Sequence, residues 1–479
     1  MNKRLLTRLV LLFGIAVMLA SCDWLFGPSD PEAEEPETDT AAPLASKAWT
    51  IMVYIDADCD LENYGMTDIN ELEAGLAAAV ASDSTIMTKL NIVVQVDRVG
   101  TIEDDEDSND TESYDDGDDW TSARRYYIQP DSTDTFASEV RERLGEVNMG
   151  DADTRNSFIE YSKRQFPATN YALILWNHGG GVRSLAPAPA ATTVSRAVAW
   201  DLTDGDDALY TGEITSALDD THDVQLLGMD ACLMGMAEVA YQFRQTTSEF
   251  GADYFVASPH TEQGDGWPYG EILKRLAGVT VTGDAGYDAS TVTTEQLAGV
   301  MVKEYGDFCT TAGENNDVLV AVDLSKMAAV KTAFDTFVTS LGDKTAAETA
   351  RDAAQHYFAF SPVAEEGEEP ANEWLDNPHF DLFDWADRMN ATDLKAAVAE
   401  AVTAYWGGTA YAATAHTTGA DGLGLGFFFP HNATDWAEHA YYTSATYTEP
   451  AEGEPYGGLL FLAGTSGWDE KLTTWYGAH

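Results

Sequence analysis

Two stretches decide the fold of this chain: Tyr171-Ala-Leu-Ile-Leu-Trp-Asn-His178-Gly-Gly-Gly181 and Val224-Gln-Leu-Leu-Gly-Met-Asp230-Ala-Cys232-Leu-Met-Gly235. Each is a short apolar run of strand length that stops at a reactive side chain, an imidazole in one and a thiol in the other. In a parallel α/β sheet, chemistry collects outside the carboxyl ends of the strands. Two neighbouring strands that end at His178 and Cys232 would present both groups to one crevice, which predicts a cysteine hydrolase.

Further apolar runs of strand length alternate with helix-like segments along the chain. The runs are nearly continuous, which is typical of strands that helices cover on both faces of a sheet. We therefore predict an α/β fold. Besides the two runs above, the predicted strands are Trp49–Ile55, Leu90–Val96, Tyr254–Ala257 and Val318–Val322. The predicted helices are Met66–Val80, Ser157–Gln165, Gly212–Leu218, Met234–Arg244 and Glu295–Phe308.

The pattern becomes less regular in the last part of the chain. An Ala-rich helical region, an acidic segment over 362–370, a helical run over 393–405 and glycine-rich strand segments around Gly422 follow one another there. We predict a main domain over residues 49–345 and a packed C-terminal subdomain over residues 346–479.

The N-terminus resembles a bacterial lipoprotein signal. Three basic residues precede an apolar stretch over 9–20 that is too short to span a membrane, and Leu19-Ala-Ser-Cys22 resembles a lipobox. We expect residues 1–21 to be a signal peptide and Cys22 to carry a lipid anchor. Residues 22–48 are rich in Pro, Glu and Asp, which predicts an extended tether. The expected location is the bacterial cell envelope, outside the cytoplasm.

The chain is strongly acidic, with 81 Asp and Glu against 26 Lys and Arg and a net charge of -55. Removal of residues 1–21, which carry three basic and no acidic side chains, changes -55 to -58. Binding to nucleic acid depends on basic patches, so this class of partner is excluded. Cationic peptides would be attracted by such a field. The same charge also fits a protein that simply stays hydrated in salty surroundings.

The flanking sequence resembles a known family. A strand that closes on His-Gly and another that closes on Asp-Ala-Cys are similar to the caspase-like group of cysteine peptidases, and the surrounding residues resemble its clostripain family. The resemblance implies a caspase-like α/β/α sandwich with a mostly parallel central sheet, and cysteine endopeptidase activity. The further matching segments are Trp49–Asp58 with Asp60-Leu61-Glu62, Trp200–Leu209, Ala257-Ser-Pro259, Gly264–Tyr269 and Gly422–Pro430.

The expected catalytic groups are the Cys232 thiol and the His178 imidazole. A free thiol is only a few per cent ionised at neutral pH, so it needs a nearby base or favourable dipoles. We expect Cys232 to begin a helix over 233–243 whose amides favour the thiolate. The resemblance implies that the amides of Gly179 and Cys232 bind the oxyanion. The alternative is that Cys232 is a core thiol and His178 a surface residue.

Asp230 is the expected specificity residue. In an extended segment it lies on the same side as Cys232, and a carboxylate there can form a bidentate pair with arginine, which the family prefers before the cleaved bond. Lysine would fit less well. Alternatively, Asp230 caps the following helix. Asp265 and Trp267 are further substrate-binding candidates, although turn chemistry alone could explain Gly-Asp-Gly in that loop.

The remaining cysteines and acidic runs offer no strong second site. Cys59 is flanked by carboxylates and Cys309 lies in a helical core stripe, and a disulfide between them stays open. No zinc-type spacing appears, so no metal site is assigned. The acidic segment 103–119 does not fit an EF-hand and is best explained as a solvated loop. Calcium stays open as a cofactor because some clostripain-like enzymes use it.

Members of this family are often cut between the histidine strand and the cysteine strand. That stretch here contains Arg183, Arg196 and a Pro/Ala-rich run, so we expect self-cleavage after either arginine. The predicted function is an endopeptidase that cleaves after arginine, and after lysine less well. The alternative is a non-enzymatic surface lipoprotein that binds basic peptides in the same crevice.

Overall fold

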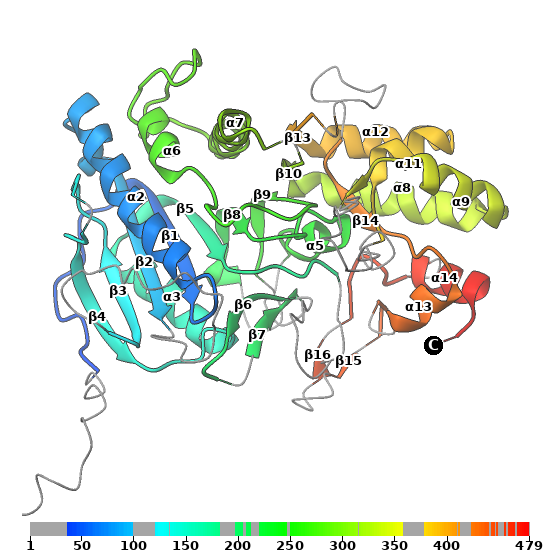
Figure 1. The fold of residues 1–479 in the computed structure, drawn as a ribbon, viewed down its shortest axis with the longest axis horizontal. Helices are drawn as coiled ribbons and strands as arrows, with labels where there is room; N and C mark the ends of the chain where they lie inside the picture. Colours follow the sequence, from blue (N-terminus) through cyan, green and yellow to red (C-terminus); the bar gives the residue numbers. More distant parts are fainter. Residues whose placement is uncertain are drawn as a thin grey trace, which may run out of the picture.

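The computed structural model is that of an α/β protein with one large central sheet (Figure 1). It describes residues 36–98, 120–133, 135–182, 197–204, 207–211, 220–246, 250–314, 316–357, 378–409, 411, 423–439, 442–445, 447–448, 455–456, 458–464 and 467–478. The expected signal peptide, Cys22, most of the tether and the acidic segment 103–119 therefore lie outside the described residues. No helix in the described part of the chain is both long and apolar enough to cross a bilayer.

The central sheet has nine strands in the order β13-β10-β9-β8-β5-β1-β2-β3-β4. Its five middle strands, β9, β8, β5, β1 and β2, are parallel, and antiparallel strands extend the sheet at both edges. The six strands expected from apolar runs are all confirmed. They are β1 (Lys47–Ala57), β2 (Leu90–Arg98), β5 (Ala168–Trp176), β8 (Val224–Asp230), β9 (Ala252–Ala257) and β10 (Val318–Asp323).

Three strands in the outer parts of the central sheet were not predicted. They are β3 (Ala123–Tyr127), β4 (Glu139–Gly145) and β13 (Val402–Gly407). The sequence of β4, EVRERLG, is mostly charged and the strand is only partly buried, so it has no continuous apolar run. The residues of β13 were expected to extend a helix. They instead pair antiparallel with β10, so part of the expected C-terminal subdomain completes the main sheet.

Helices cover both faces of the sheet, and alternate strand residues serve the two layers. In β1, Ile51 and Val53 pack in one core, whereas Met52 and Tyr54 pack in the other. Residues of α2 (Glu62–Ser82), α6 (Tyr269–Leu276) and α7 (Thr294–Ala312) fill the first core. Residues of α3 (Ala152–Gln165), α5 (Ala237–Gln242) and α8 (Met327–Ser340) fill the second. This arrangement is the predicted α/β/α sandwich.

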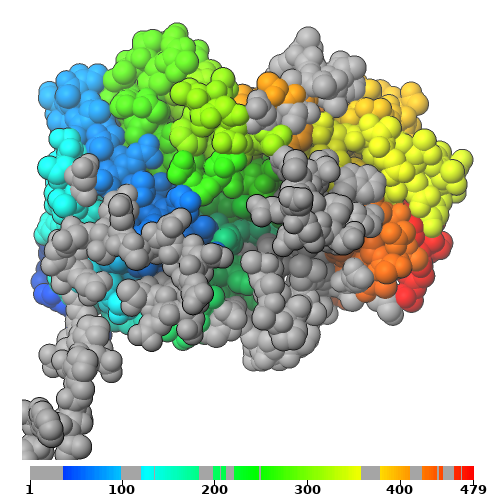
Figure 2. Space-filling view, in the orientation of Figure 1, coloured from blue at the N-terminus to red at the C-terminus, as the bar shows by residue number. Residues whose placement is uncertain are grey.

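The C-terminal part is joined to this second core by aromatic packing. Trp385, Phe427 and Trp468 are fully or almost fully buried in it together with Phe334 of α8. The elements that carry this packing are α9 (Lys344–Ala353), β11 (His356–Tyr357), β12 (His379–Asp381), α11 (Leu382–Arg388), α12 (Thr392–Ala401), β14 (Gly426–Phe428), α13 (Ala433–Glu438) and α14 (Trp468–Tyr476). In Figure 2 these residues, yellow to red, gather at the end of the molecule opposite the blue N-terminal elements.

Candidate functional site

The strands expected to carry the catalytic groups are neighbours in the sheet. β5 pairs in parallel with β8, with Trp176 opposite Asp230, and the Asn177 amide donates to the Asp230 carbonyl at 3.4 Å. His178 and Cys232 therefore each lie two residues beyond a paired position, at the same edge of the sheet. A Cβ atom built on Gly179 would lie 2.1 Å from the Cys232 carbonyl oxygen, so only glycine fits here. The segments after the two strands are thus in direct contact.

The segment around Cys232 is a turn and not the start of a helix. Leu233 has a φ of 63°, and α5 begins only at Ala237. The amides of Leu233 and Gly235 donate to the carbonyls of His260 and Ser258, at 2.9 and 2.7 Å. Because these donors bond across to the loop after β9, the predicted helix start at Cys232 is wrong. The thiol consequently gains nothing from a helix N-terminus, and its position is fixed by the loop after β9.

The environment of Cys232 disfavours its anion. Burial raises the pKa of the thiol, and the nearby carboxylates of Asp230 and Asp317 raise it further. Two main-chain interactions oppose these effects and lower the pKa. The larger comes from the Glu262 amide, which donates to Sγ at 3.3 Å, and the other from the backbone of Cys232 itself. The thiol therefore needs a base to accept its proton.

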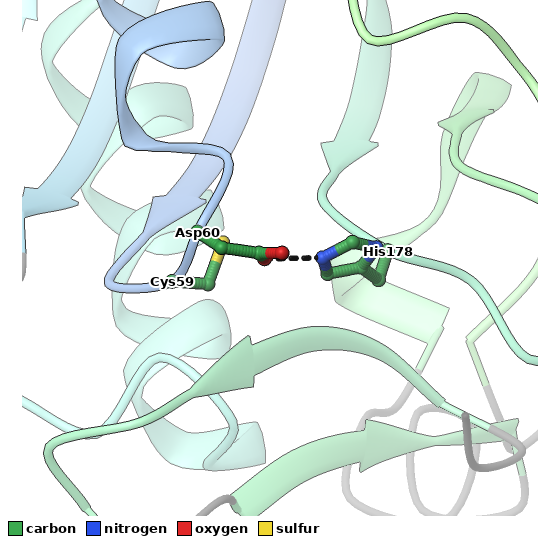
Figure 3. Close-up of side chains that lie close together, drawn as sticks. All are labelled: Cys59, Asp60 and His178. Atoms are coloured by element: carbon green, nitrogen blue, oxygen red, sulfur yellow. Dashed lines mark hydrogen bonds and ion pairs between the residues drawn. The ribbon is translucent and has the colours of Figure 1, made fainter. Parts of the chain in front are cut away.

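His178 is held by a carboxylate that the sequence did not single out as functional. Its Nε2 lies 2.6 Å from Oδ1 of Asp60, and Figure 3 shows the two side chains pointing toward each other. This hydrogen bond lowers the pKa of Asp60. Asp60 follows β1, the strand beside β5, so the rule that placed His178 beside Cys232 also places Asp60 at this edge. An acid partner of this kind orients an imidazole and fixes its tautomer.

Cys59 completes a small cluster with these two residues. Ligand atoms of Cys59, Asp60 and His178 lie within 4.8 Å of one another, and a thiolate, a carboxylate and an imidazole are the ligands that zinc prefers. Burial, however, raises the pKa of Cys59 well above its usual range. Cys59 and Cys309 are both free, buried thiols, so the disulfide left open between them is absent.

A group of carboxylates, two of them buried and one half-buried, lies near Cys232. Asp230 accepts hydrogen bonds from the Trp267 amide at 3.1 Å and the Tyr269 hydroxyl at 2.7 Å, and it does not cap α5. Asp68 accepts from the Trp176 indole at 2.7 Å, and Glu262 accepts from the Trp267 indole at 3.2 Å. Sequence reasoning missed Asp68 and Glu262, because neither lies at the end of a strand.

The carboxylates of this acidic pocket, Asp68, Asp230 and Glu262, affect one another. Burial raises the pKa of Asp230 to about 6. Burial first, and then the charge of Asp230, raises the pKa of Asp68 and of Glu262 well above the usual range. A cation that entered the pocket would relieve the repulsion between these acids.

The other two substrate-binding candidates occupy different environments. Trp267 is fully buried, and its ring packs so close to Gly228 that a Cβ there would lie 3.0 Å away. Its indole thus lies inside the protein and only its polar atoms contact the pocket. Asp265 is exposed, and its charge contributes to the raised pKa of Asp68. Gly266, which lies between Asp265 and Trp267 in the chain, has a φ of 60°. A Cβ atom built on it would lie 3.1 Å from a carboxylate oxygen of Asp68 and from one of Asp230.

Three candidate residues lie outside the described residues. They are the expected lipid anchor Cys22 and the expected cleavage positions Arg183 and Arg196. The segment that contains both arginines lies between β5 and β6 (Ala197–Asp201) in the chain. The predicted helix over 212–218 is also outside the described part.

Comparison with protein families gives a match over most of the chain. A model of the clostripain family matches residues 53–475. Clostripain from Hathewaya histolytica is 33% identical over 368 residues, which cover 72% of this chain and 66% of that protein. The chain therefore spans slightly less than two thirds of that relative's length.

Solved structures with the same fold include two C11 proteases. A secreted C11 cysteine protease from Bacteroides thetaiotaomicron, in complex with an irreversible peptide inhibitor, has a TM-score of 0.53 and 17% identity over 80% of this chain and 92% of that chain. An inactive zymogen C11 protease from Parabacteroides distasonis has a TM-score of 0.54 and 16% identity over 81% of this chain and 93% of that chain. These likenesses confirm the fold. Together with the family match across residues 53–475, they establish that the chain belongs to the clostripain family of cysteine peptidases.

Proposed function

We propose that this protein is an endopeptidase that cleaves after arginine, with Cys232 as nucleophile and His178 as general acid and base. The observation that carries the proposal is the parallel pairing of β5 with β8, which brings the segments of both residues into contact. The Asp60 carboxylate supports the role of His178, because it stabilises the imidazolium that forms when the thiol loses its proton.

The proposed reaction has two steps. The Cys232 sulfur attacks the carbonyl carbon of the scissile bond, and the amides of Gly179 and Cys232 bind the oxyanion of the tetrahedral intermediate. His178 gives its proton to the leaving amine, which leaves a thioester on Cys232. In the second step His178 removes a proton from water, and the water oxygen attacks the carbonyl carbon of the thioester. The bond between this carbon and the Cys232 sulfur breaks, the acid is released, and the sulfur takes the proton from His178.

The acidic pocket supports arginine as the residue before the cleaved bond. A guanidinium would pair with Asp230 and reduce the repulsion among Asp230, Asp68 and Glu262. Comparing arginyl, lysyl and citrullinyl amides tests this choice, because citrulline has nearly the shape of arginine without its charge. We expect arginyl amides to be hydrolysed fastest and citrullinyl amides to be nearly inert. Equal rates for arginyl and citrullinyl amides would show that Asp230 does not recognise the charge of the substrate arginine.

We further propose that the chain cuts itself after Arg183 or Arg196. A fold neighbour is described as an inactive zymogen, which fits activation by cleavage in this family. Intact-mass analysis of the wild type should give two fragments whose masses add up to one hydrolysed chain, whereas Cys232→Ala should stay intact. Arg183→Ala and Arg196→Ala then identify the cleaved bond. A wild type that is active as a single chain would refute self-processing and leave the peptidase function standing.

The proposed location is the outer side of a bacterial membrane, through a lipid on Cys22. Labelling of the expressed protein with radioactive palmitate tests this point. Label should appear in the wild type and disappear in Cys22→Ala. An unlabelled wild type, released into the medium, would exclude the anchor.

The second candidate function is a surface lipoprotein that binds basic peptides without cutting them. The acidic pocket alone would serve this role. A binding protein does not require a histidine that is hydrogen-bonded to an acid on the strand end next to that of Cys232, which is why the peptidase is preferred. Binding of an arginyl peptide without hydrolysis, in processed wild-type protein, would favour the binding protein.

A further inference from the structure

A buried thiol that has no part in the proposed reaction lies beside His178. Cys59 follows β1 by two residues, and His178 follows β5 by two residues. Because β1 and β5 pair in parallel, with Ile55 opposite Trp176, the two residues leave the sheet at the same edge. Figure 3 shows the Asp60 carboxylate bonded to the imidazole, with Cys59 beside it. A thiol, a carboxylate and an imidazole thus share one small site.

The distances among these side chains fit a bound zinc ion after a small adjustment. One ligand atom from each of Cys59, Asp60 and His178 lies within 4.8 Å of the other two. Zinc holds sulfur at about 2.3 Å and nitrogen or oxygen at about 2.0–2.2 Å, so two ligands of a tetrahedral ion lie roughly 3.4–3.6 Å apart. The hydrogen bond of 2.6 Å between Asp60 and His178 would open by about 0.8 Å, and the sulfur would move by at most about 1.2 Å.

The kinds of ligand favour zinc over calcium or magnesium. Calcium and magnesium bind oxygen, and a thiol and an imidazole do not suit them. Thiolate, imidazole and carboxylate are the three ligand types of zinc sites. The His178 and Asp60 side chains are 41% and 62% exposed, so an ion can enter from solvent and keep a water in its fourth position. Cys59, which is 2% exposed, closes the inner side of the site.

Polar groups hold the sulfur of Cys59 in position. The Asn177 side-chain amide donates to Sγ at 3.3 Å, and the thiol donates to the Asp56 carbonyl at 3.7 Å. Burial raises the pKa of this thiol well above its usual range, so it stays protonated as long as no metal is bound. A ligating thiol is deprotonated by the metal itself. The Asn177 amide would then stabilise the thiolate, as groups around a metal ligand generally do.

We propose that Cys59, Asp60 and His178 form an inhibitory zinc site. Binding replaces the thiol proton of Cys59 by the ion, and the proton passes to solvent. One ring nitrogen of His178 gives its lone pair to zinc, and the other nitrogen carries the proton of the neutral imidazole. The ring then has no lone pair left to accept a proton from Cys232. The inhibition rests on the proposed role of His178, whereas the site itself does not.

Metal binding to the full-length Cys232→Ala variant tests the site without the peptidase reaction. This variant keeps all three ligands and lacks the other thiol near His178. We expect it to bind cobalt, used as a coloured probe for zinc, with a thiolate-to-cobalt charge-transfer band, and zinc should displace the cobalt. Cys59→Ser in the same background should abolish the band. It should also weaken zinc binding in calorimetry at least about tenfold, since even loss of a group around a ligand costs about 10–100-fold.

The matched control for binding is Cys309→Ser, which replaces another buried free thiol and should change neither the band nor the affinity.

Inhibition is measured on active protein. Zinc should inhibit hydrolysis of an arginyl amide by the wild type and by Cys309→Ser, and EDTA should restore the rate. Each variant is compared with its own rate in the absence of zinc. In Cys59→Ser the zinc concentration that gives half-inhibition should rise at least about tenfold.

Three results would overturn the proposal. The first is a Cys232→Ala protein, shown by its Tm to be folded, that binds neither cobalt nor zinc. The second is zinc binding that Cys59→Ser leaves unchanged, which would place the ion elsewhere. The third is inhibition that is absent, or equally strong in Cys59→Ser, since the latter would assign it to Cys232 and His178 alone.

Failure of the zinc site and failure of the peptidase function give different results. If the wild type hydrolyses no arginyl amide, the proposed function fails, and the binding measurements on Cys232→Ala still decide the site. If Cys59→Ser does not fold, Asp60→Asn replaces it, because the Asp60 side chain is mostly exposed. In the Cys232→Ala background Asp60→Asn should also weaken zinc binding at least about tenfold, and unchanged binding would exclude the site.

Discussion

The carboxyl ends of the central strands and the aromatic core of the C-terminal part are built on opposite principles. Around β1, β5 and β8, buried carboxylates lie against one another and their pKa values are raised. Around Trp385, aromatic rings pack on one another. The centroid of its ring lies 5.0 Å from that of Phe427 and 5.9 Å from that of Trp468. Repulsion among buried charges costs stability, whereas burial of large apolar rings contributes it. The comparison indicates that the strand ends serve chemistry and that the aromatic core supports them.

Replacing the proposed nucleophile should separate activity from stability most sharply. We expect Cys232→Ala to reduce kcat by a factor on the order of 10⁵ to 10⁶, as loss of a nucleophile does in other covalent peptidases. The Tm of the variant should not fall, because removal of Sγ removes only a weak hydrogen bond from the Glu262 amide. Hydrolysis of an arginyl amide and thermal unfolding are measured for the wild type and for Cys232→Ala. Both proteins must be either uncut or cut at the same bond. Residual activity within tenfold of the wild type would exclude Cys232 as the nucleophile.

The reverse effect is expected in the aromatic core. Trp385→Ala should reduce the free energy of unfolding by about 3–5 kcal/mol, because it leaves a cavity where a fully buried indole was. Well below the Tm, kcat should stay near that of the wild type. Chemical denaturation measures the first quantity, and Trp385→Phe is the matched control with a smaller loss. A large fall in kcat with unchanged stability would mean that this core is coupled to the site.

The acidic pocket should govern the choice of substrate. Asp230→Asn should reduce kcat/KM for arginyl amides by about 100-fold, since loss of one partner of a buried charge pair costs about 2–5 kcal/mol. The effect on a citrullinyl amide should be much smaller. Steady-state kinetics on both substrates give the ratio. Asp265→Asn is the comparison variant, because its exposed carboxylate is expected to contribute less.

The raised pKa of Asp230 predicts a pH dependence. Arginine binding needs the ionised carboxylate, and the pKa of Asp230 is about 6, so protonation weakens binding as the pH falls below this value. We expect kcat/KM for an arginyl amide to fall about fivefold between pH 6 and pH 5 beyond any change seen with Asp230→Asn, because the ionised fraction of Asp230 falls by about that factor. An identical profile for wild type and variant would contradict this assignment.

The smallest effect is expected at the acid beside the histidine. The Asp60 and His178 side chains are 62% and 41% exposed, and exposed ion pairs contribute up to about 1 kcal/mol. Asp60→Asn should therefore lower kcat by about fivefold or less and leave KM unchanged. Kinetics at saturating substrate measure the change, with Asp131→Asn as the control for loss of an acid elsewhere on the protein. A rise in KM with normal kcat would mean that Asp60 binds substrate and does not position the imidazole.

Much of the central architecture could be predicted from local pattern. The apolar runs of β1, β2, β5, β8, β9 and β10 are buried strands because their residues must be covered on both faces. Patterns of this kind do not mark edge strands such as β4, where one side stays in solvent and charged residues are tolerated. Nor do they show where the helix after Cys232 begins. The residues after Cys232 look helical in sequence, but their amides bond to the loop after β9.

The sequence by itself determined the fold class, the family and the two strand ends that carry His178 and Cys232, because hydrophobic periodicity and strand-end chemistry are local properties. Only the tertiary structure decided which acids meet. Asp60 contacts His178, Glu262 and Asp68 join Asp230, and Asp58 joins Glu146 and Asp201. These partners come from separate segments of the chain, and their charges interact through space, so their spacing in the sequence carries no record of the distance between them.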